Sequence, residues 1–134
     1  MESGFTVSVL AGQLTFVVCY RALGGDGGMA VEVHGETGHP ETIAKRTQLL
    51  RFDCFERDPH YHLDPDGKNT VLKLPPEADN LSWTAHSIQN NLPGLIRLAG
   101  FPETADRVNV EEVAGSMKQI RDAMMGLAAS AIAT

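Results

Sequence analysis

Apolar and polar residues alternate along the first part of the chain, and this alternation predicts β-strands. Phe5, Val7 and Val9 are separated by polar residues, and a second apolar run covers residues 14–21 after a short connection at residues 11–13. A period of two sends successive side chains to opposite faces of a sheet. The short connection predicts an antiparallel hairpin, and the apolar residues on both faces of 14–21 predict a central strand.

A glycine cluster at residues 24–28 predicts a flexible hairpin turn. Phosphate-binding glycine loops lead into a helix, whereas residues 29–34 alternate as another strand. In that strand Glu32 and His34 should project from the same face. The polar residues 35–47, which include Gly and Pro, predict a loop.

Residues 49–66 combine a strand pattern with several chemically active side chains. Over residues 49–55 the alternation assigns Phe52 to the core and both Arg51 and Asp53 to the opposite face. Pro59 and Pro65 predict an irregular corner beyond this strand, with an edge or a bulge. Residues 64–67 then predict a turn, and residues 71–74 predict the last strand.

The second half of the chain changes to a helical period. Apolar residues recur at helical spacing over residues 81–96, after a cap at Asp79 or Asn80, and Pro93-Gly94 should either kink or divide this helix. Asn109 and Glu112 resemble a capping box before a longer helix that extends to about residue 131. Strands followed by helices predict one α+β domain over residues 1–134.

The predicted fold is an antiparallel sheet over about residues 1–75, packed on one face by two or three helices from about residues 79–132. The last helix carries small residues on more than one side. Such a helix packs closely either on its own sheet or on a second copy of the chain, which leaves a homodimer open.

Charge and composition exclude several classes of protein. Of the 134 residues, 43% are hydrophobic and 21% are charged, which is typical of a globular protein. The formal net charge of −6 and the scattered basic residues argue against nucleic acid as a partner. Apolar runs shorter than the roughly 18 residues of a membrane span, and an N-terminus without a basic region, predict a cytoplasmic protein without a membrane segment or secretory signal.

Both cysteines, Cys19 and Cys54, lie within apolar strand patterns. This placement indicates buried, reduced thiols in a cytoplasmic protein. The alternative is a disulfide between neighbouring strands.

His60-Tyr61-His62 is the sharpest candidate for chemistry. In an extended segment, side chains two positions apart project from the same face, so both imidazoles can reach one metal ion. Two histidines with one carboxylate suit zinc or iron(II). We therefore predict a metal site formed by His60, His62, His34 and Asp53. The further candidates for the third ligand are Glu56, Asp58 and Asp64.

Without a metal, His60 or His62 could act as a general acid or base, with Asp53 and Arg51 as the other catalytic residues. The ligand would then be a small polar molecule. Charged residues on an open sheet face also have a simpler explanation, because Glu32 or Asp53 could form cross-strand ion pairs with Arg51.

The segment Arg51-Phe52-Asp53, followed by Pro59-His60-Tyr61-His62, resembles a motif of small uncharacterised bacterial domains. These domains carry an R-[FY]-D strand before a Pro-His-x-His, and some look like toxin components of toxin–antitoxin pairs. The resemblance implies a bacterial origin and no particular activity.

Two hypotheses about function follow. The first is a metal-binding or histidine-based site for a small polar ligand. The second is a non-catalytic protein-binding or regulatory module, homodimeric or associated with a toxin–antitoxin partner, in which the histidines are structural.

Overall fold

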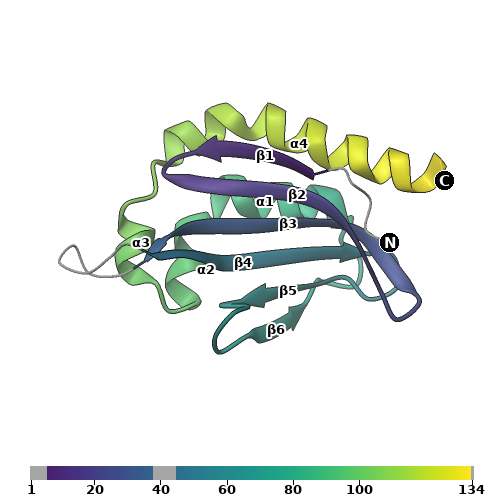
Figure 1. Cartoon of the computed structure of the whole chain (residues 1–134), viewed down its shortest axis with the longest axis horizontal. Coiled ribbons are helices and arrows are strands. Elements are labelled where there is room, and N and C mark those ends of the chain that lie inside the picture. Colours follow the sequence, from purple (N-terminus) through teal and green to yellow (C-terminus); the bar gives the residue numbers. More distant parts are fainter. Residues whose placement is uncertain (1–5, 38–44, 134) are drawn as a thin grey trace.

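Residues 6–37 and 45–133 are described by the computed structural model, and they form one antiparallel sheet with helices on one face (Figure 1). The sheet has six strands in the order β1-β2-β3-β4-β5-β6, so each strand pairs with the next one along the chain. The strands are β1 (Thr6–Ala11), β2 (Leu14–Leu23), β3 (Asp26–Thr37), β4 (Lys45–Phe55), β5 (His60–Leu63) and β6 (Thr70–Lys73). This arrangement confirms the predicted fold class.

Both predicted hairpins in the first part of the sheet are confirmed. Gly12 and Gln13 join β1 to β2 with φ values of 60° and 70°, and Gly24 and Gly25 join β2 to β3 with φ values of 58° and 82°. Two-residue turns with both residues at positive φ match the twist of the flanking strands. Glycine tolerates this backbone region without steric cost, which explains the glycines at these turns.

The loop predicted over residues 35–47 is wrong at both ends. β3 continues to Thr37 and β4 begins at Lys45, and the residues between them, 38–44, lie outside the description. A register shift at Val33 and His34 lets Leu49 and Leu50, although adjacent in sequence, both be fully buried. The ends of β3 and β4 are rich in polar residues, as an open sheet face allows, so the sequence pattern there resembles a loop.

The irregular corner predicted after β4 is confined to residues 56–59, and the edge or bulge predicted with it is wrong. His60–Leu63 is a regular strand that pairs with β4 on one side and β6 on the other, so it is not an edge. Pro59 comes just before β5, where its missing N–H removes no ladder bond. The predicted turn is confirmed, since Gly67 N donates to the carbonyl of Asp64 (3.1 Å) and Lys68 N donates to its carboxylate (2.9 Å).

Four helices follow the sheet: α1 (Asn80–Asn90), α2 (Leu92–Leu98), α3 (Pro102–Asp106) and α4 (Val110–Ala133). Asp79 is the N-cap of α1 and accepts a bond from Ser82 N (2.9 Å). Pro93 lies in the first turn of α2, so the predicted helix is divided rather than kinked. Asn109 caps α4 by accepting from Glu112 N (3.1 Å), as predicted.

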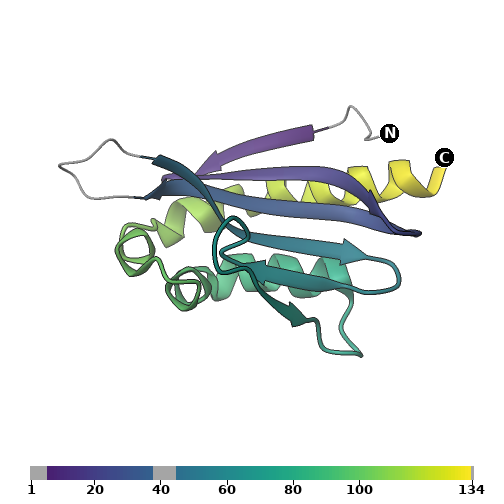
Figure 2. The same cartoon turned by 60° about the horizontal axis from the view of Figure 1, so that its bottom comes forward.

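The helices all cover the same face of the sheet, and the opposite face is open (Figure 2). Phe16, Phe52, Ile88, Ile120 and Met124 are among the fully buried side chains between the two layers. α4 packs on β1, β2 and β3 of its own sheet, while α1 and α2 cover β4. No helix in the described ranges is both long and apolar enough to span a membrane.

The two cysteines lie on opposite faces of the sheet. Cys19 is directly opposite Ala30, which is opposite Asp53 of the open face, whereas Cys54 contacts Thr84 of α1 at 3.2 Å. The two thiols therefore cannot form a disulfide with each other. Burial raises the pKa of the Cys54 thiol to about 11.

Candidate metal centre

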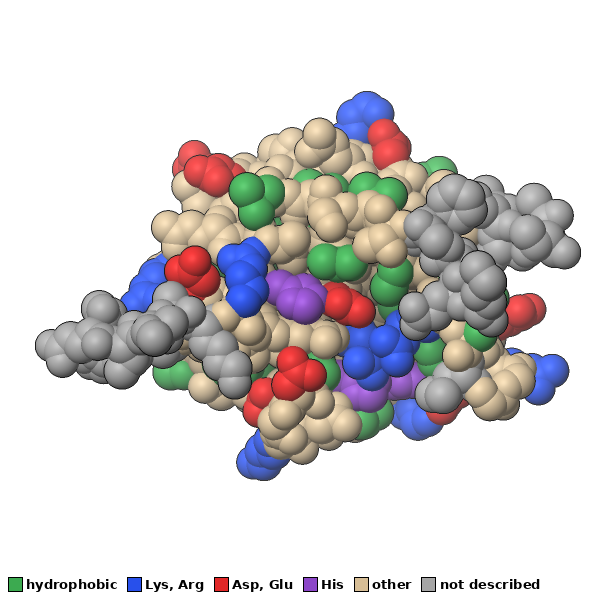
Figure 3. Space-filling view, viewed as in Figure 1, with side chains coloured by type: hydrophobic (Ala, Val, Ile, Leu, Met, Phe, Trp, Pro, Cys, Tyr) green, Lys and Arg blue, Asp and Glu red, His purple; other side chains and the backbone are tan. Residues whose placement is uncertain are grey.

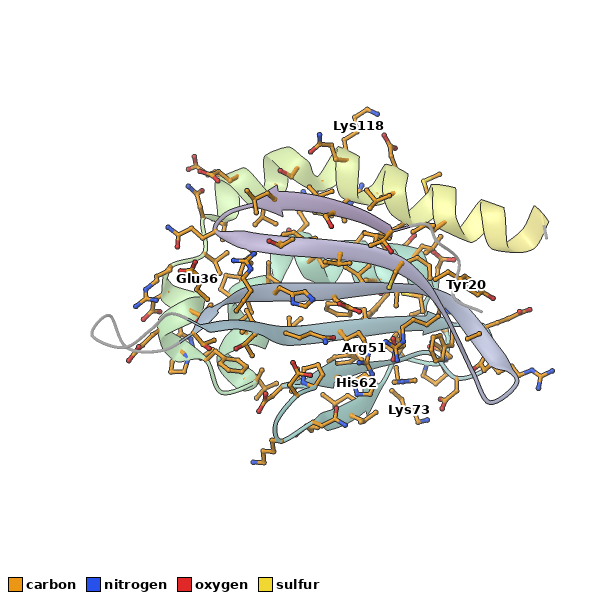
Figure 4. The ribbon with its side chains drawn as sticks, viewed as in Figure 1. Tyr20, Glu36, Arg51, His62, Lys73 and Lys118 are labelled. Atoms are coloured by element: carbon orange, nitrogen blue, oxygen red, sulfur yellow. The ribbon has the colours of Figure 1, made fainter. Side chains whose placement is uncertain are left out.

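The register between β4 and β5 brings four predicted site residues together on the open face. Asp53 lies directly opposite His60, and Arg51 lies directly opposite His62. Directly opposed residues of antiparallel strands project from the same face with their Cβ atoms about 5 Å apart. Figure 4 shows Arg51 and His62 side by side, projecting from β4 and β5.

Both imidazoles converge on one carboxylate oxygen. His60 Nε2 lies 3.1 Å from Asp53 Oδ2, and His62 Nε2 lies 3.0 Å from the same oxygen. One potential ligand atom from each of the three residues lies within 4.8 Å of the other two. The group formed by Asp53, His60 and His62 could therefore hold a metal ion.

The far nitrogen of each ring is held by an oxygen atom. His60 Nδ1 lies 2.7 Å from the carbonyl oxygen of Asp58, and His62 Nδ1 lies 2.7 Å from Oδ1 of Asn69. A carbonyl or amide oxygen only accepts hydrogen bonds, so Nδ1 is the donor in both rings. This outer contact orients each ring and leaves its Nε2 directed at Asp53, as is usual for metal-binding histidines.

Asn69 reaches His62 because of the turn between β5 and β6. Its backbone has a positive φ of 53°, and its N–H donates to the carbonyl of Asp64 at 2.7 Å. Asparagine is among the few residues that adopt this conformation readily. Asn69 was not among the predicted site residues, although its position just after the Asp64–Gly67 turn was a signal in the sequence.

The carboxylate of Asp53 is buried, with 2% of its side chain exposed, and two arginines compensate for its charge. Arg51 Nε lies 3.2 Å from Oδ1, and Arg21 Nε lies 3.7 Å from the same atom. Oδ1 nonetheless has no hydrogen-bond partner among the described residues. A buried charge is costly unless it is paired, so this carboxylate requires the cations around it.

His34 lies on the same face but outside this group. Its Nε2 is 2.8 Å from Glu32 Oε1, and Glu32 lies opposite Arg51 in the register of β3 and β4. The two further ligand candidates with described contacts also point elsewhere, since Asp58 pairs with Lys73 (2.5 Å) and Asp64 caps its turn. Three of the four predicted ligands therefore come together, and His34 does not join them.

Charged side chains of both signs gather around the histidines on the open face (Figure 3). A hollow of about 450 Å³ lies elsewhere, beside the β1–β2 turn. Its lining includes Arg46 and Glu112 but no histidine or cysteine, and the carboxylate of Glu112 already accepts a bond from Gly12 N (3.1 Å). The ligand set that could hold a metal ion therefore lies at the histidine pair and not in this hollow.

A family model described as a domain of unknown function (DUF7700) matches residues 8–124. The match includes the whole sheet except the start of β1, and it includes the three residues of the metal group. No significant match exists among curated proteins or among solved structures.

Proposed function

Because the chain belongs to the DUF7700 family of unknown function, we propose a function from the site itself: the protein binds a divalent transition metal, zinc or iron(II). The ligands would be Nε2 of His60, Nε2 of His62 and the carboxylate of Asp53. The bound metal would then bind or act on a small polar molecule at the open face of the sheet.

The convergence of both Nε2 atoms on Asp53 Oδ2 carries this proposal. With Nδ1 donating in each ring, each Nε2 directs a lone pair at a carboxylate oxygen about 3 Å away. Two acceptors at that distance repel each other unless a proton or a cation lies between or beside them. At His62 the guanidinium of Arg51 already supplies a cation, since its Nη2 donates to Nε2 at 3.0 Å, so the lone pair without a described donor is that of His60. One metal ion would accept the lone pairs of both rings and bind the carboxylate at the same time.

Three protein ligands leave coordination positions open for water or a ligand. This donor set is found in catalytic zinc sites and in iron(II) oxygenases, both of which keep at least one position open. A zinc ion so held would polarise a bound ligand or lower the pKa of a bound water. The protein contributes a rigid sheet that fixes all three ligands, together with Asp58 and Asn69, which orient the rings.

The test is the metal content of protein purified without a histidine tag. We expect about one zinc or iron per chain, lost when His60→Ala and His62→Ala are combined. The matched control is His34→Ala with His86→Ala, which removes two histidines outside the group and should leave the metal content unchanged. Substoichiometric metal that the His60/His62 double variant does not alter would overturn the proposal.

The edge strand β1 favours a second candidate function, binding to another copy of the chain. Among the described strands β1 pairs only with β2, and its six residues include no charge and no proline. The other edge, β6, has four residues and ends at Lys73. Short and charged edges resist the addition of another strand, whereas an uncharged edge favours it.

Exposed apolar side chains on β1 support this candidate. Leu10 is 76% exposed and Val7 is 40% exposed, one on each face of the strand. Two β1 strands related by a two-fold axis would run antiparallel, and each would meet the other's donors and acceptors. The expected product is a homodimer with a continuous sheet.

Sedimentation over a range of concentrations tests the homodimer. We expect a dimer that Leu10→Lys dissociates, while Leu98→Lys, at an exposed position on α2, leaves it intact. A wild-type chain that remains monomeric at high micromolar concentration would exclude this use of β1.

A further inference from the structure

The arginines beside the metal group identify a class of ligand. We propose that the open coordination position takes a small anion with two or more oxygens, a carboxylate or a phosphate, held between the metal and Arg51. This inference rests on the proposed metal site and deepens it.

Arg51 donates a hydrogen bond to the lone pair of His62 Nε2, which a metal would need. Its Nη2 donates to His62 Nε2 at 3.0 Å, and its Nε lies 3.3 Å from Asp53 Oδ2. A guanidinium only donates, so a metal bound to His62 Nε2 must displace Nη2. Arg51 Nε can keep its ion pair with Asp53 Oδ1, 3.2 Å away, while Nη2 becomes available beside the metal.

The charge of the site then requires an anion. Arg51 and Arg21 already outnumber the single carboxylate of Asp53, and a divalent ion adds two more positive charges. The neighbouring carboxylate of Glu32, which lies 2.8 Å from His34 Nε2, offsets one of these charges and still leaves the site positive. The side chains of Arg51 and Asp53 are only 17% and 2% exposed, so water screens this excess weakly. A neutral ligand would leave the repulsion in place, whereas an anion offsets it.

Arg51 and the metal together match an oxyanion in shape. A guanidinium presents donors in a planar fork that suits the oxygens of carboxylates and phosphates. One oxygen of the anion would bind the metal, and another would accept from Nη2 of Arg51. Arg21, like Arg51, lies beside Oδ1 of Asp53, and the Nε of Arg21 has no hydrogen-bond partner in the described part of the chain.

The ligand is a small anion and not a polyanionic chain. The net charge of −6 disfavours a long phosphate backbone, and acidic side chains share the open face with the arginines. A compact ligand needs to reach only the metal group and its two arginines.

The experiment measures zinc affinity by competition with a chelator, at constant ionic strength, in chloride, acetate or inorganic phosphate. We expect acetate or phosphate to tighten zinc binding at least tenfold relative to chloride. By linkage, the zinc-loaded protein should bind that anion more tightly than the metal-free protein by the same factor. A larger effect of acetate would identify a carboxylate ligand, and a larger effect of phosphate a phosphate ligand.

Arg51→Gln separates the anion site from the metal site. This variant should bind zinc in chloride at least as tightly as the wild type, because a competing cation is gone, and it should lose most of the anion effect. Arg51→Lys keeps the charge without the fork and should retain part of the effect, which also provides a second variant if Arg51→Gln does not fold. Arg57→Gln, at an exposed position outside the group, is the matched control and should behave as the wild type.

Two results would overturn the inference in distinguishable ways. Zinc binding that neither anion changes, or an anion effect that Arg51→Gln leaves intact, would remove the anion site while the metal site stands. A wild-type protein that binds no zinc under any of the three conditions would remove both.

Discussion

Asp53 and His60 face each other directly across β4 and β5, and Oδ2 of Asp53 lies 3.1 Å from Nε2 of His60. The same oxygen lies 3.0 Å from Nε2 of His62. Both imidazole rings therefore direct Nε2 at one buried carboxylate oxygen. The opposite nitrogen, Nδ1, of each ring is held by an oxygen of Asp58 or Asn69.

Asn69→Gly should weaken metal binding without removing a ligand. Glycine adopts the positive φ of 53° at this position, so the turn is retained while the oxygen that accepts from His62 Nδ1 is lost. Loss of such an outer contact typically lowers metal affinity about 10- to 100-fold. Chelator competition measures the change, and Asn69→Asp, which retains an acceptor, is the control. Equal affinity in the glycine variant would show that Asn69 does not orient His62.

Asp53→Asn should destabilise the metal-free protein. Removing the charge leaves Arg51 and Arg21 beside a neutral amide, and loss of one partner of a buried ion pair costs about 3 kcal/mol in the free energy of unfolding. Urea denaturation with a chelator present measures this loss. The control is Asp58→Asn, whose exposed pair with Lys73 should be worth less than about 1 kcal/mol. Similar losses of unfolding free energy in Asp53→Asn and Asp58→Asn would show that burial of Asp53 does not strengthen its ion pairs.

Asp79→Ala should lower stability in a pH-dependent way. The backbone N–H of Ser82, followed by the Ser82 hydroxyl, lowers the pKa of Asp79 in the folded state. A lowered folded pKa means that the contribution is fully present above the unfolded pKa of about 4, and is lost as pH falls through the folded pKa. At pH 7 the loss should be about 1 kcal/mol, as for other N-caps.

Denaturation at pH 7 and at pH 3 measures the pH dependence. The difference between wild type and Asp79→Ala should shrink at the lower pH. Asp66→Ala, at an exposed turn position, is the control and should have little effect at either pH. A difference that grows on acidification would have the wrong sign for a carboxylate cap.

Cys54 should resist alkylation in the folded protein. Its side chain is buried against Thr84, and burial raises its thiol pKa to about 11, so little thiolate is present at pH 8. We expect Cys54 to react at least about 100-fold more slowly than in urea, where an ordinary thiol pKa of about 8.5 applies. Mass spectrometry of peptides after timed labelling gives the rate. Recovery of a peptide in which Cys19 and Cys54 are linked would contradict their placement on opposite faces.

Local patterns in the sequence were sufficient to predict which face of the sheet each strand residue occupies, where the first two hairpin turns lie and which residues cap the helices. The period of two assigned Phe52 to the core and both Arg51 and Asp53 to the open face, because side-chain direction in a strand depends only on parity. The caps at Asp79 and Asn109 were readable because each depends on residues only three positions apart. The ends of β3 and β4 were not readable, since hydrogen bonds between distant segments define them.

The sequence by itself determined that an antiparallel sheet carries His60, His62 and Asp53 near one another along the chain, and that helices cover one face. Only the tertiary structure decided that β5 is a paired strand, that its register sets Asp53 opposite His60, and that His34 binds Glu32 instead. Register is a property of two strands and of the connection between them, here residues 56–59. A shift of one residue would have turned both histidines to the helical face. The convergence of Asp53, His60 and His62 therefore depends on how β4 pairs with β5, and the sequence of a single strand does not specify that pairing.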